Sequence, residues 1–265
     1  MSSKVQSVVR AFDILYCFTE GEPELSAAEI AARLGLNRTT VHRLLVTLEA
    51  CHAVQRNPVN RKYGLSPRLV AFSSVLMRRN GLADAARGPI LALRDSTGET
   101  VALHVAEETT RIVFMQAESP HDLRVAYPRI GEVIPLHLGA PSKAILAFRT
   151  EAEIEEYLEQ HDLVAATPYS ITDSTVLRVE LKAIRERGYA TSFQERREGV
   201  ASIAAPIFQH DGSPVASINV IAPLSRMDPA QVPEVGKQVM ATAAEISRLL
   251  GNGGDRPDGY PGSRS

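Results

Sequence analysis

Two short amphipathic segments, separated by a tight corner, lie between residues 26 and 50. The second segment carries an apolar stripe with helical spacing, at Val41, Leu44, Leu45 and Leu48. The first begins at Ser26 and has Glu29 three residues later, which is the pattern of a helix capping box. Gly35 and Asn37 lie at the corner, where glycine suits the end of one helix and asparagine the cap of the next. This pattern predicts a helix-turn-helix.

The outer face of the second predicted helix is polar and basic, with Arg38, Thr39, Thr40, His42, Arg43 and Thr47. In a recognition helix, side chains of these types contact base edges and phosphates in the major groove of DNA. A solvated face on an ordinary three-helix core is the alternative interpretation of the same stripe. The capping box, the corner glycine and the basic face together favour DNA binding.

A β-wing is predicted directly after this motif. Residues 53–56 and 62–65 resemble short strands, and the turn-forming residues 57–60 lie between them. Basic side chains at or beside the tip suit phosphate or minor-groove contact, which adds affinity and salt dependence more than sequence information. The predicted DNA-binding residues are therefore Ser26, Arg38, Thr39, Thr40, His42, Arg43, Arg56, Arg61 and Lys62.

Apolar helical patterns flank the winged motif on both sides. Upstream, a helix is predicted to complete the small core with Val5, Val8, Val9, Phe12, Ile14 and Leu15. Downstream, residues 66–81 predict a linker helix, with a proline in the first turn, two arginines near its end and a final glycine. We therefore place a DNA-binding domain at residues 1–65, followed by a linker whose apolar face can contact a partner subunit.

Strands and helices alternate in blocks from residue 82 to residue 250, which predicts an α+β domain with antiparallel hairpins and a sensor-like layout. Strands are expected at 100–105, 111–115, 123–127, 133–138, 189–193, 202–208 and 214–221. Helices are expected at 82–97, 141–148, 151–160, 176–187 and 229–250. The tail at residues 251–265 is rich in Gly, Pro, Asp and Ser, and we expect it to be disordered.

Charge is divided unevenly along the 265 residues, although the net charge is only −2. The first 80 residues hold 11 Lys and Arg against 6 Asp and Glu, and the rest hold 18 against 25. A basic amino-terminal part can approach DNA phosphates, while an acidic carboxy-terminal part stays off the duplex. The small net charge therefore does not argue against DNA binding.

Several other classes of protein find little support in the sequence. No apolar run reaches membrane-spanning length and no secretory signal is apparent, so we expect a cytoplasmic protein with no membrane partner. Cys17 and Cys51 lack metal-site or disulfide spacing. Common nucleophile, phosphate-loop, dinucleotide and zinc motifs are missing, so an enzyme is disfavoured and no cofactor is predicted. His104 and His137 could meet in space, but two histidines are weak evidence for a metal, and none is predicted.

Five segments resemble the IclR (isocitrate lyase regulator) family of bacterial transcription factors, and the resemblance extends from about residue 5 to residue 250. The segments are residues 7–15, 36–45, 61–69, 135–147 and 199–207. The resemblance implies a winged helix, a linker helix and a GAF/PAS-like effector domain that binds a small metabolite. It also implies self-association as a dimer or a dimer of dimers.

The resemblance, together with the helix start near Ser142, also implies a set of effector-binding residues. They are Leu123, Ala126, Ile134, Ala140, Pro141, Ser142, Ser192, Val200, Ser202, Asn219 and Ile221. Ser192 replaces a frequent acidic residue of the family and Ser202 a frequent cysteine, while Ala126 is small for its position. These three differences predict an effector pocket that is roomier and more polar than is usual in the family. We expect an organic acid of more than three carbons, a hydroxylated aromatic acid for example, held by serine hydroxyls, Asn219 and the start of the helix.

The sequence thus predicts a regulator that binds double-stranded operator DNA under the control of a small organic acid. Whether the effector activates or derepresses is not predicted. Two alternatives stay open: an enzyme that acts on a small metabolite and carries an accessory winged helix, and a DNA-binding repressor that needs no ligand.

Overall fold

The computed structural model describes residues 4–19, 21–79 and 81–252, and the chain divides into two compact units between residues 80 and 81. We call them the N-terminal unit and the C-terminal unit. Each has its own buried apolar core, so each is described by itself.

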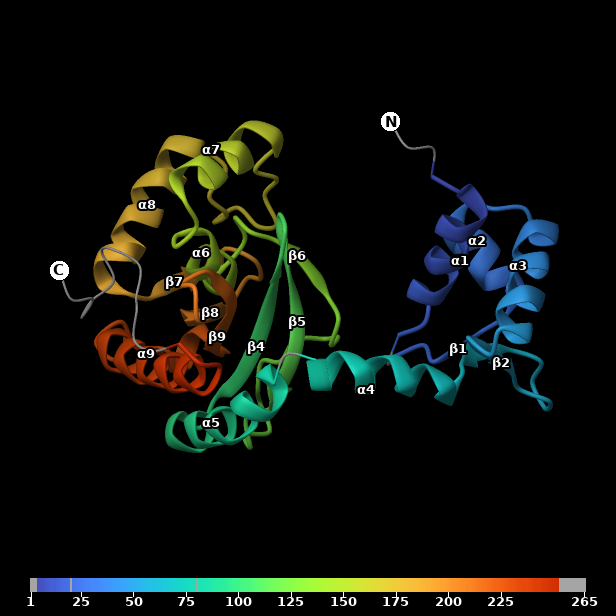
Figure 1. Ribbon diagram of the computed structural model, residues 1–265, viewed down its shortest axis with the longest axis horizontal. Helices are drawn as coiled ribbons and strands as arrows, with labels where there is room; N and C mark the ends of the chain where they lie inside the picture. Colours follow the sequence, from blue (N-terminus) through green and yellow to red (C-terminus); the bar gives the residue numbers. More distant parts are fainter. Residues whose placement is uncertain (1–3, 20, 80, 253–265) are drawn as a thin grey trace. The chain divides into compact units, whose positions relative to one another are not determined.

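The N-terminal unit is a winged helix (Figure 1). Its helices are α1 (Gln6–Tyr16), α2 (Ala27–Leu34) and α3 (Arg38–Ala50). A three-stranded antiparallel sheet of order β1-β3-β2 completes it, with strands β1 (Glu24–Leu25), β2 (Val54–Arg56) and β3 (Tyr63–Leu65). The helix-turn-helix and the wing are confirmed. Strand β1 was not expected from the sequence, because a strand of two residues is too short to show a hydrophobic periodicity.

The helix ends form as the sequence predicts. The Ser26 hydroxyl accepts a hydrogen bond from the Glu29 backbone N–H (3.2 Å), and the Glu29 carboxylate accepts one from the Ser26 N–H (2.7 Å). Gly35 has a φ of +63°, a left-handed conformation that glycine adopts without a Cβ clash. The side chain of Asn37 then caps α3 at the N–H of Thr39 (2.8 Å). These contacts fix the corner between the two helices.

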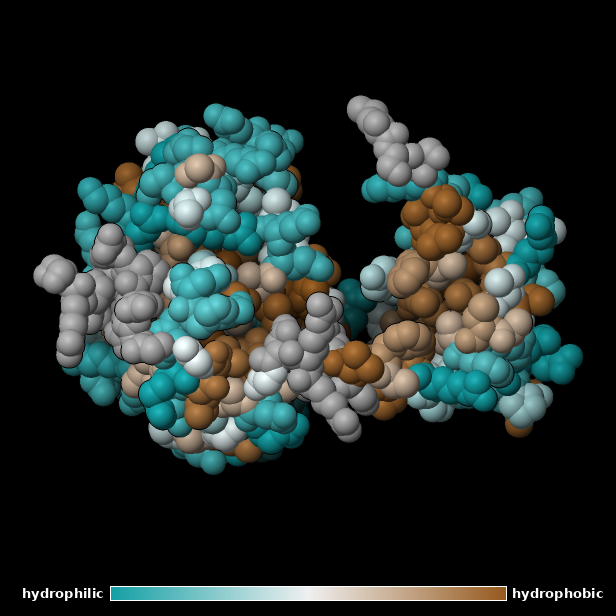
Figure 2. Space-filling view, in the orientation of Figure 1, coloured by the Kyte–Doolittle hydropathy of each residue, from teal (hydrophilic) through white to brown (hydrophobic). Residues whose placement is uncertain are grey.

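Helix α1 corrects one expectation about the core. Ile14 is fully buried and Leu15 packs beside it, but Val5, Val8 and Phe12 are exposed, Phe12 by 54%. One side of α1 is enough to contribute its share to the core of so small a unit. The apolar residues of α1 extend around the helix beyond that side, so some of them stay exposed. Figure 2 shows hydrophobic residues gathered over α1 on the visible face of this unit.

The segment predicted as a linker helix forms a short 3-10 helix, η1 (Pro67–Leu69), which continues into α4 (Val70–Arg79). Ser66 caps it through a hydrogen bond from the Arg68 N–H (3.3 Å). Asn80, within the predicted linker, lies outside the described residues, and Gly81 caps the next helix. Helix α4 belongs to the N-terminal unit.

The C-terminal unit is built on a six-stranded antiparallel sheet of order β6-β5-β4-β9-β8-β7 (Figure 1). The strands are β4 (Thr100–Glu107), β5 (Thr110–Ala117), β6 (Val133–Pro135), β7 (Ala190–Phe193), β8 (Val200–Phe208) and β9 (Pro214–Pro223). The helices are α5 (Leu82–Thr97), α6 (Ala140–Leu146), α7 (Glu151–Gln160), α8 (Ser174–Arg187), η2 (Leu224–Arg226) and α9 (Val232–Leu249). The α+β fold class is confirmed.

The two faces of this sheet differ, because successive side chains of a strand point to opposite faces. Leu103, Ile203 and Ile218 belong to the face that packs against α5 and α9. The opposite face carries small and polar residues of the same strands, such as Ser202 and Asn219, and part of it is covered by α6, α7 and α8. The polar side chains of the sheet centre are therefore placed on the α6 side.

One strand prediction is wrong and a second is wrong in part. Residues 123–127 form no strand, since Tyr127 exchanges both of its backbone hydrogen bonds with the Gln116 side chain (3.0 and 3.1 Å) rather than with a neighbouring strand. The strand predicted at 133–138 ends at Pro135. The chain turns there, because the Leu138 N–H bonds back to the Pro135 carbonyl (3.2 Å) and Gly139 has a φ of +80°.

The predicted disordered tail falls outside the described residues from residue 253 onward. Gly251 and Asn252 are described, and the Asn252 side chain donates a hydrogen bond to the Gln209 carbonyl (2.7 Å). Within the described part of the chain, no helix combines the length and the apolar character needed to cross a membrane.

Candidate DNA-contact surface and C-terminal cavity

The predicted recognition helix α3 presents its basic side chains to solvent. Arg38, Thr39, His42 and Arg43 are exposed, and Thr40 is half-buried. Val41, Leu45 and Leu48 on the other side of α3 are buried in the core, which fixes the rotation of the helix about its axis. The outward face is thus free to meet a DNA groove.

The basic side chains of the wing differ in exposure and in whether they already pair with a carboxylate of the protein. Arg56 and Arg61 are exposed, and the Arg56 Nε donates to the Arg61 carbonyl (3.2 Å). Lys62 is half-buried, and its ammonium group pairs with the Glu29 carboxylate (3.2 Å). A lysine already paired within the protein gains less from a phosphate than a free arginine does, so Arg56 and Arg61 are the stronger candidates for backbone contact.

Ser26 has a structural role that is sufficient to explain its position. We expect Ser26→Ala to lower the free energy of unfolding of the N-terminal unit by about 1 kcal/mol, because the N–H at the third position of α2 loses its partner. Urea unfolding without DNA measures this change. The exposed Ser7 inside α1 provides the control, since Ser7→Ala should change stability by less than about 0.5 kcal/mol. Unchanged stability combined with weaker DNA binding would instead make Ser26 a DNA contact.

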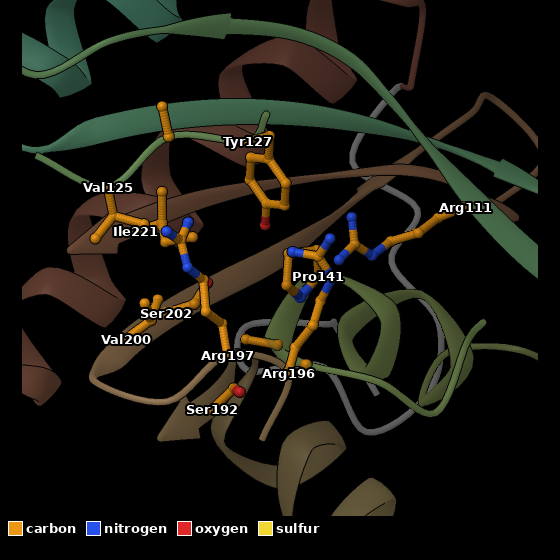
Figure 3. A pocket seen from close by; sticks show the side chains of 13 residues that line it. Arg111, Val125, Tyr127, Pro141, Ser192, Arg196, Arg197, Val200, Ser202 and Ile221 are labelled. Atoms are coloured by element: carbon orange, nitrogen blue, oxygen red, sulfur yellow. The ribbon is translucent and has the colours of Figure 1, made fainter. Parts of the chain in front are cut away.

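A small cavity lies on the α6 side of the C-terminal sheet; it encloses about 20 Å³ within an empty space of about 390 Å³ that includes its opening to solvent. We call it the C-terminal cavity. It is lined by Arg111, Val125, Ala126, Tyr127, Gly139, Ala140, Pro141, Ser192, Arg196, Arg197, Val200, Ser202 and Ile221 (Figure 3). Seven of the predicted effector residues are among them: Ala126, Ala140, Pro141, Ser192, Val200, Ser202 and Ile221. Segments distant in the sequence thus meet at one site.

Four predicted effector residues do not line this cavity. Leu123 is 72% exposed, on the irregular segment that replaces the expected strand. Ile134 is buried in the neighbouring apolar core. Ser142 and Asn219 lie behind the lining, where Ser142 accepts a hydrogen bond from Arg111 (2.7 Å) and Asn219 donates one to Ser202 (2.8 Å).

Arg111 is the most unusual residue of the lining, because its side chain is completely buried. Its Nε donates to the Ser142 hydroxyl and its Nη1 to the Nδ1 of His104 (2.6 Å), while Nη2 has no hydrogen-bond partner among the described residues. Burial lowers the pKa of Arg111 to about 10, so the guanidinium stays charged at neutral pH. A buried cation with an unused donor is costly unless a ligand completes it.

A directed chain of hydrogen bonds continues from Arg111. A guanidinium can only donate, so the Nδ1 of His104 must accept and its Nε2–H must donate to the Asn219 carbonyl oxygen (2.9 Å). Burial and the Arg111 charge lower the pKa of His104, which keeps the ring neutral as this arrangement needs. The Asn219 amide then donates to the Ser202 hydroxyl and, at 3.3 Å, to the Tyr127 hydroxyl.

Two further arginines face the cavity from the loop after β7. Arg196 forms an ion pair with Glu132 (2.5 Å) and lies over the ring of Tyr127, at 5.3 Å from the ring centre. Arg197 is exposed, and no carboxylate partner is found for it within the described ranges. No carboxylate belongs to the lining. The site is therefore positive and rich in donors.

These arginines and Tyr127 were not predicted. The sequence does contain a signal for Arg111, since a charged residue that alternates with apolar ones in a strand is either exposed or paired in a site. Arg196 and Arg197 form only a basic pair in a loop, and no periodicity places a loop over a cavity. The ring of Tyr127 lies beside His104 at a centroid distance of 4.8 Å, a contact between distant segments that sequence periodicity does not predict.

The histidines named in the sequence belong to separate networks. His137 contacts the Tyr157 hydroxyl (2.8 Å) and the Val164 carbonyl (3.1 Å), far along the chain from the partners of His104. The two histidines, which the sequence leaves open to meeting in space, therefore have separate hydrogen-bond partners. Across residues 4–19, 21–79 and 81–252, no group of three His, Cys, Asp or Glu side chains is placed to hold a metal ion.

Lys143 of α6 is buried below the cavity and does not project into solvent. Its ammonium group pairs with Glu195 (2.6 Å) and lies 3.6 Å from Glu180, while Glu180 also pairs with Arg187 (2.8 Å). Burial raises the pKa of Glu195 despite the lysine beside it. This ion pair ties α6 to the loop that carries Arg196 and Arg197.

Models of two families match the chain. Residues 7–58 match the IclR helix-turn-helix domain, and residues 75–248 match the bacterial transcriptional regulator IclR C-terminal domain. The HTH-type transcriptional regulator XynR of Escherichia coli (strain K12) is 31% identical over 93% of this chain and 98% of its own length.

Solved structures agree in fold. The Thermotoga maritima IclR matches with a TM-score of 0.76 and 30% identity, over 94% of this chain and all of that one. An IclR homolog from Microbacterium hydrocarbonoxydans, complexed with 4-hydroxybenzoate, matches with a TM-score of 0.78 and 21% identity, over 92% and 98%. The winged helix, the six-stranded antiparallel sheet, the two family models and the relative at 31% identity lead to one assignment: the chain belongs to the IclR family of DNA-binding transcriptional regulators.

Proposed function

We propose that a small organic acid, bound in the C-terminal cavity, controls the operator affinity or the activity of this regulator. The observation that carries the proposal is the buried guanidinium of Arg111, whose Nη2 faces no acceptor in the described protein. An anion supplies both the missing acceptor and the missing negative charge. A hydroxylated aromatic acid is one member of this class, since the Ser202 and Tyr127 hydroxyls can bond its hydroxyl group.

A ligand changes operator binding only if it prefers one of two states of the regulator. The test is therefore operator affinity with and without acid, by fluorescence anisotropy on the DNA upstream of the gene for this chain. An acid that binds in a 1:1 ratio to the chain and shifts operator affinity supports the proposal. Turnover of the acid with no effect on DNA binding would favour an enzyme. Normal operator binding that no acid changes would favour a ligand-independent DNA binder.

On the DNA side, we propose that two winged helices of a dimer read adjacent half-sites of a pseudo-palindromic operator. The exposed apolar residues of α1, of its N-cap and of α4 supply surface for self-association: Val5, Val8, Phe12, Val70, Phe72 and Val75. Dimers can pair further into tetramers. Sedimentation of the protein with one operator duplex measures the number of chains bound, and one chain per duplex would contradict the dimer.

Arg43→Ala is expected to weaken operator binding by about 1–3 kcal/mol if the arginine reads a guanine, because a bidentate contact to a base edge is lost. Arg38→Ala tests the neighbouring exposed arginine of α3 in the same way. Arg56→Ala in the wing should instead weaken binding to all sequences and reduce its salt dependence. Anisotropy titrations at several salt concentrations separate the two effects.

Arg129→Ala removes the same charge from an exposed position of the C-terminal unit and serves as the control. Its operator affinity should equal that of the unmodified protein. Unchanged operator affinity in both Arg38→Ala and Arg43→Ala would overturn the assignment of α3 as the recognition helix.

A further inference from the structure

We propose that the C-terminal cavity is built for a small dicarboxylate, with one carboxylate held at Arg111 and the other at Arg197. This inference rests on the proposed function, in which an organic acid occupies the cavity, and it specifies the second charged group of that acid. Three features of the lining support it: the fixed position of Arg111, the direction of the hydroxyl groups, and the balance of charge.

The first carboxylate site is defined by what Arg111 already contacts. Its Nε is used by Ser142 and its Nη1 by His104, so the guanidinium is held from two sides and Nη2 is left over. The Arg111 guanidinium also lies over the Tyr127 ring, at 5.7 Å from the ring centre. Because a guanidinium can only donate hydrogen bonds, the group that satisfies Nη2 must carry a lone pair, and a ligand carboxylate is such a group. Its complete burial makes that contact strong, since water does not compete for the donor.

The hydroxyl groups beside Arg111 are also oriented to donate. Asn219 donates to the oxygens of Ser202 and Tyr127, at 2.8 and 3.3 Å, and each oxygen thereby accepts one hydrogen bond. The proton of each hydroxyl is left to bond a group in the cavity. The donors on this side of the cavity therefore favour an acceptor such as a carboxylate.

The charge balance points to a second negative group. Glu132 pairs with Arg196 and also interacts electrostatically with Arg111, but within the described part of the chain no carboxylate lies at ion-pair distance from Arg111 or Arg197. In the view of Figure 3 the Arg197 guanidinium lies on the side of Val125 and Ile221, whereas Arg111 and Arg196 point in from the side of Pro141. A monocarboxylate can neutralise one of these two sides, and a dicarboxylate can neutralise both.

Calorimetric titration of the full chain at fixed ionic strength tests the inference with matched acids. Succinate, glutarate, isophthalate and terephthalate are each compared with their own monoamide, which keeps the shape and removes one charge, and 4-hydroxybenzoate is a third arm for terephthalate. At least one diacid is expected to bind about tenfold more tightly than its monoamide, the typical gain of one charge-assisted contact.

Arg197→Gln should abolish that tenfold difference while leaving the affinity for the monoamide within about twofold, because Arg197 is exposed and no ion pair joins it to another described residue. Arg129→Gln, an exposed arginine outside the lining, should preserve the difference. Arg111→Gln should weaken the diacid and the monoamide alike, since both place a carboxylate at Arg111.

Equal binding of diacid and monoamide would overturn the inference, and so would a diacid preference that persists in Arg197→Gln. Tighter binding of 4-hydroxybenzoate than of terephthalate would overturn it in favour of a hydroxyl at the second position. After any of these outcomes, an acid that still shifts operator affinity would support the proposed function, although the dicarboxylate inference fails. Failure of every diacid to bind overturns the inference directly.

Discussion

Lys143→Met is expected to lower the free energy of unfolding of the C-terminal unit by about 3–5 kcal/mol, the usual cost of removing one partner of a buried ion pair. The Lys143 side chain is 1% exposed, and the change leaves the carboxylate of Glu195 in a buried site with no cation. The Oε2 of Glu195 already has no hydrogen-bond partner among the described residues. Chemical unfolding at neutral pH, followed by circular dichroism, measures the loss.

The loss should depend on pH in a defined direction. Burial raises the pKa of Glu195, so the folded protein binds a proton more readily than the unfolded one, and stability falls as pH rises from the ordinary pKa of glutamate through the raised value. Without Lys143 this pKa rises further and the fall extends to higher pH. The penalty of Lys143→Met is therefore smallest in acid, where Glu195 is protonated, and reaches its full size above the raised pKa.

Two variants separate this cause from the loss of packing. Lys182→Met removes an exposed lysine of α8 and should change stability by less than about 0.5 kcal/mol. Lys143→Met combined with Glu195→Gln removes both charges and should recover part of the lost stability. A double variant that is less stable than Lys143→Met by the cost of an independent substitution would contradict the ion-pair explanation.

Leu45→Ala is expected to destabilise the N-terminal unit by about 2–5 kcal/mol and to abolish operator binding at physiological temperature. Leu45 is fully buried at the centre of the winged-helix core, and truncation to alanine loses apolar burial and leaves a cavity. A unit of about 80 residues has little stability to lose. Because the C-terminal unit has a separate core, binding of acids should persist.

Thermal unfolding and limited proteolysis of the full chain check this expectation. Cleavage should begin in the N-terminal unit of Leu45→Ala at temperatures where the C-terminal unit is still protected. Val46→Ala is the control, since Val46 is adjacent in α3 but 50% exposed, and its stability should be nearly unchanged. Simultaneous unfolding of both units would show that their stabilities are coupled.

The elements that local chemistry determines could be predicted from the sequence. Ser26, Gly35 and Asn37 mark the helix ends of the winged motif through short-range hydrogen bonds and backbone conformation, which depend on few neighbours. The strand period likewise places Ser202 and Asn219 on one face of the sheet, because their side chains follow the alternation of β8 and β9.

The elements that depend on long-range contacts could not be predicted. The family resemblance implies Leu123 as an effector residue, but the strand predicted at 123–127 does not form, since the backbone of Tyr127 bonds to the Gln116 side chain. Arg111 was missed because its partner His104 is on the neighbouring strand and Ser142 comes from a helix 31 residues further along the chain. No local sequence pattern predicts a buried cation whose hydrogen-bond partners come from two other elements of the fold.

In the hydrogen-bond chain from Arg111 to Ser202, one substitution could change which groups the cavity presents, donors or acceptors. Asn219 orients the hydroxyl groups of Ser202 and Tyr127, which line the cavity, but it does not line the cavity itself. A carboxylate in the place of its amide would have nearly the same shape but would accept where the amide donates, and both hydroxyl protons would then turn toward it. A relative with the same backbone and a carboxylate at this position could thus present hydroxyl lone pairs to the cavity where this chain presents hydroxyl protons. Such a cavity would favour a ligand that donates hydrogen bonds rather than one that accepts them.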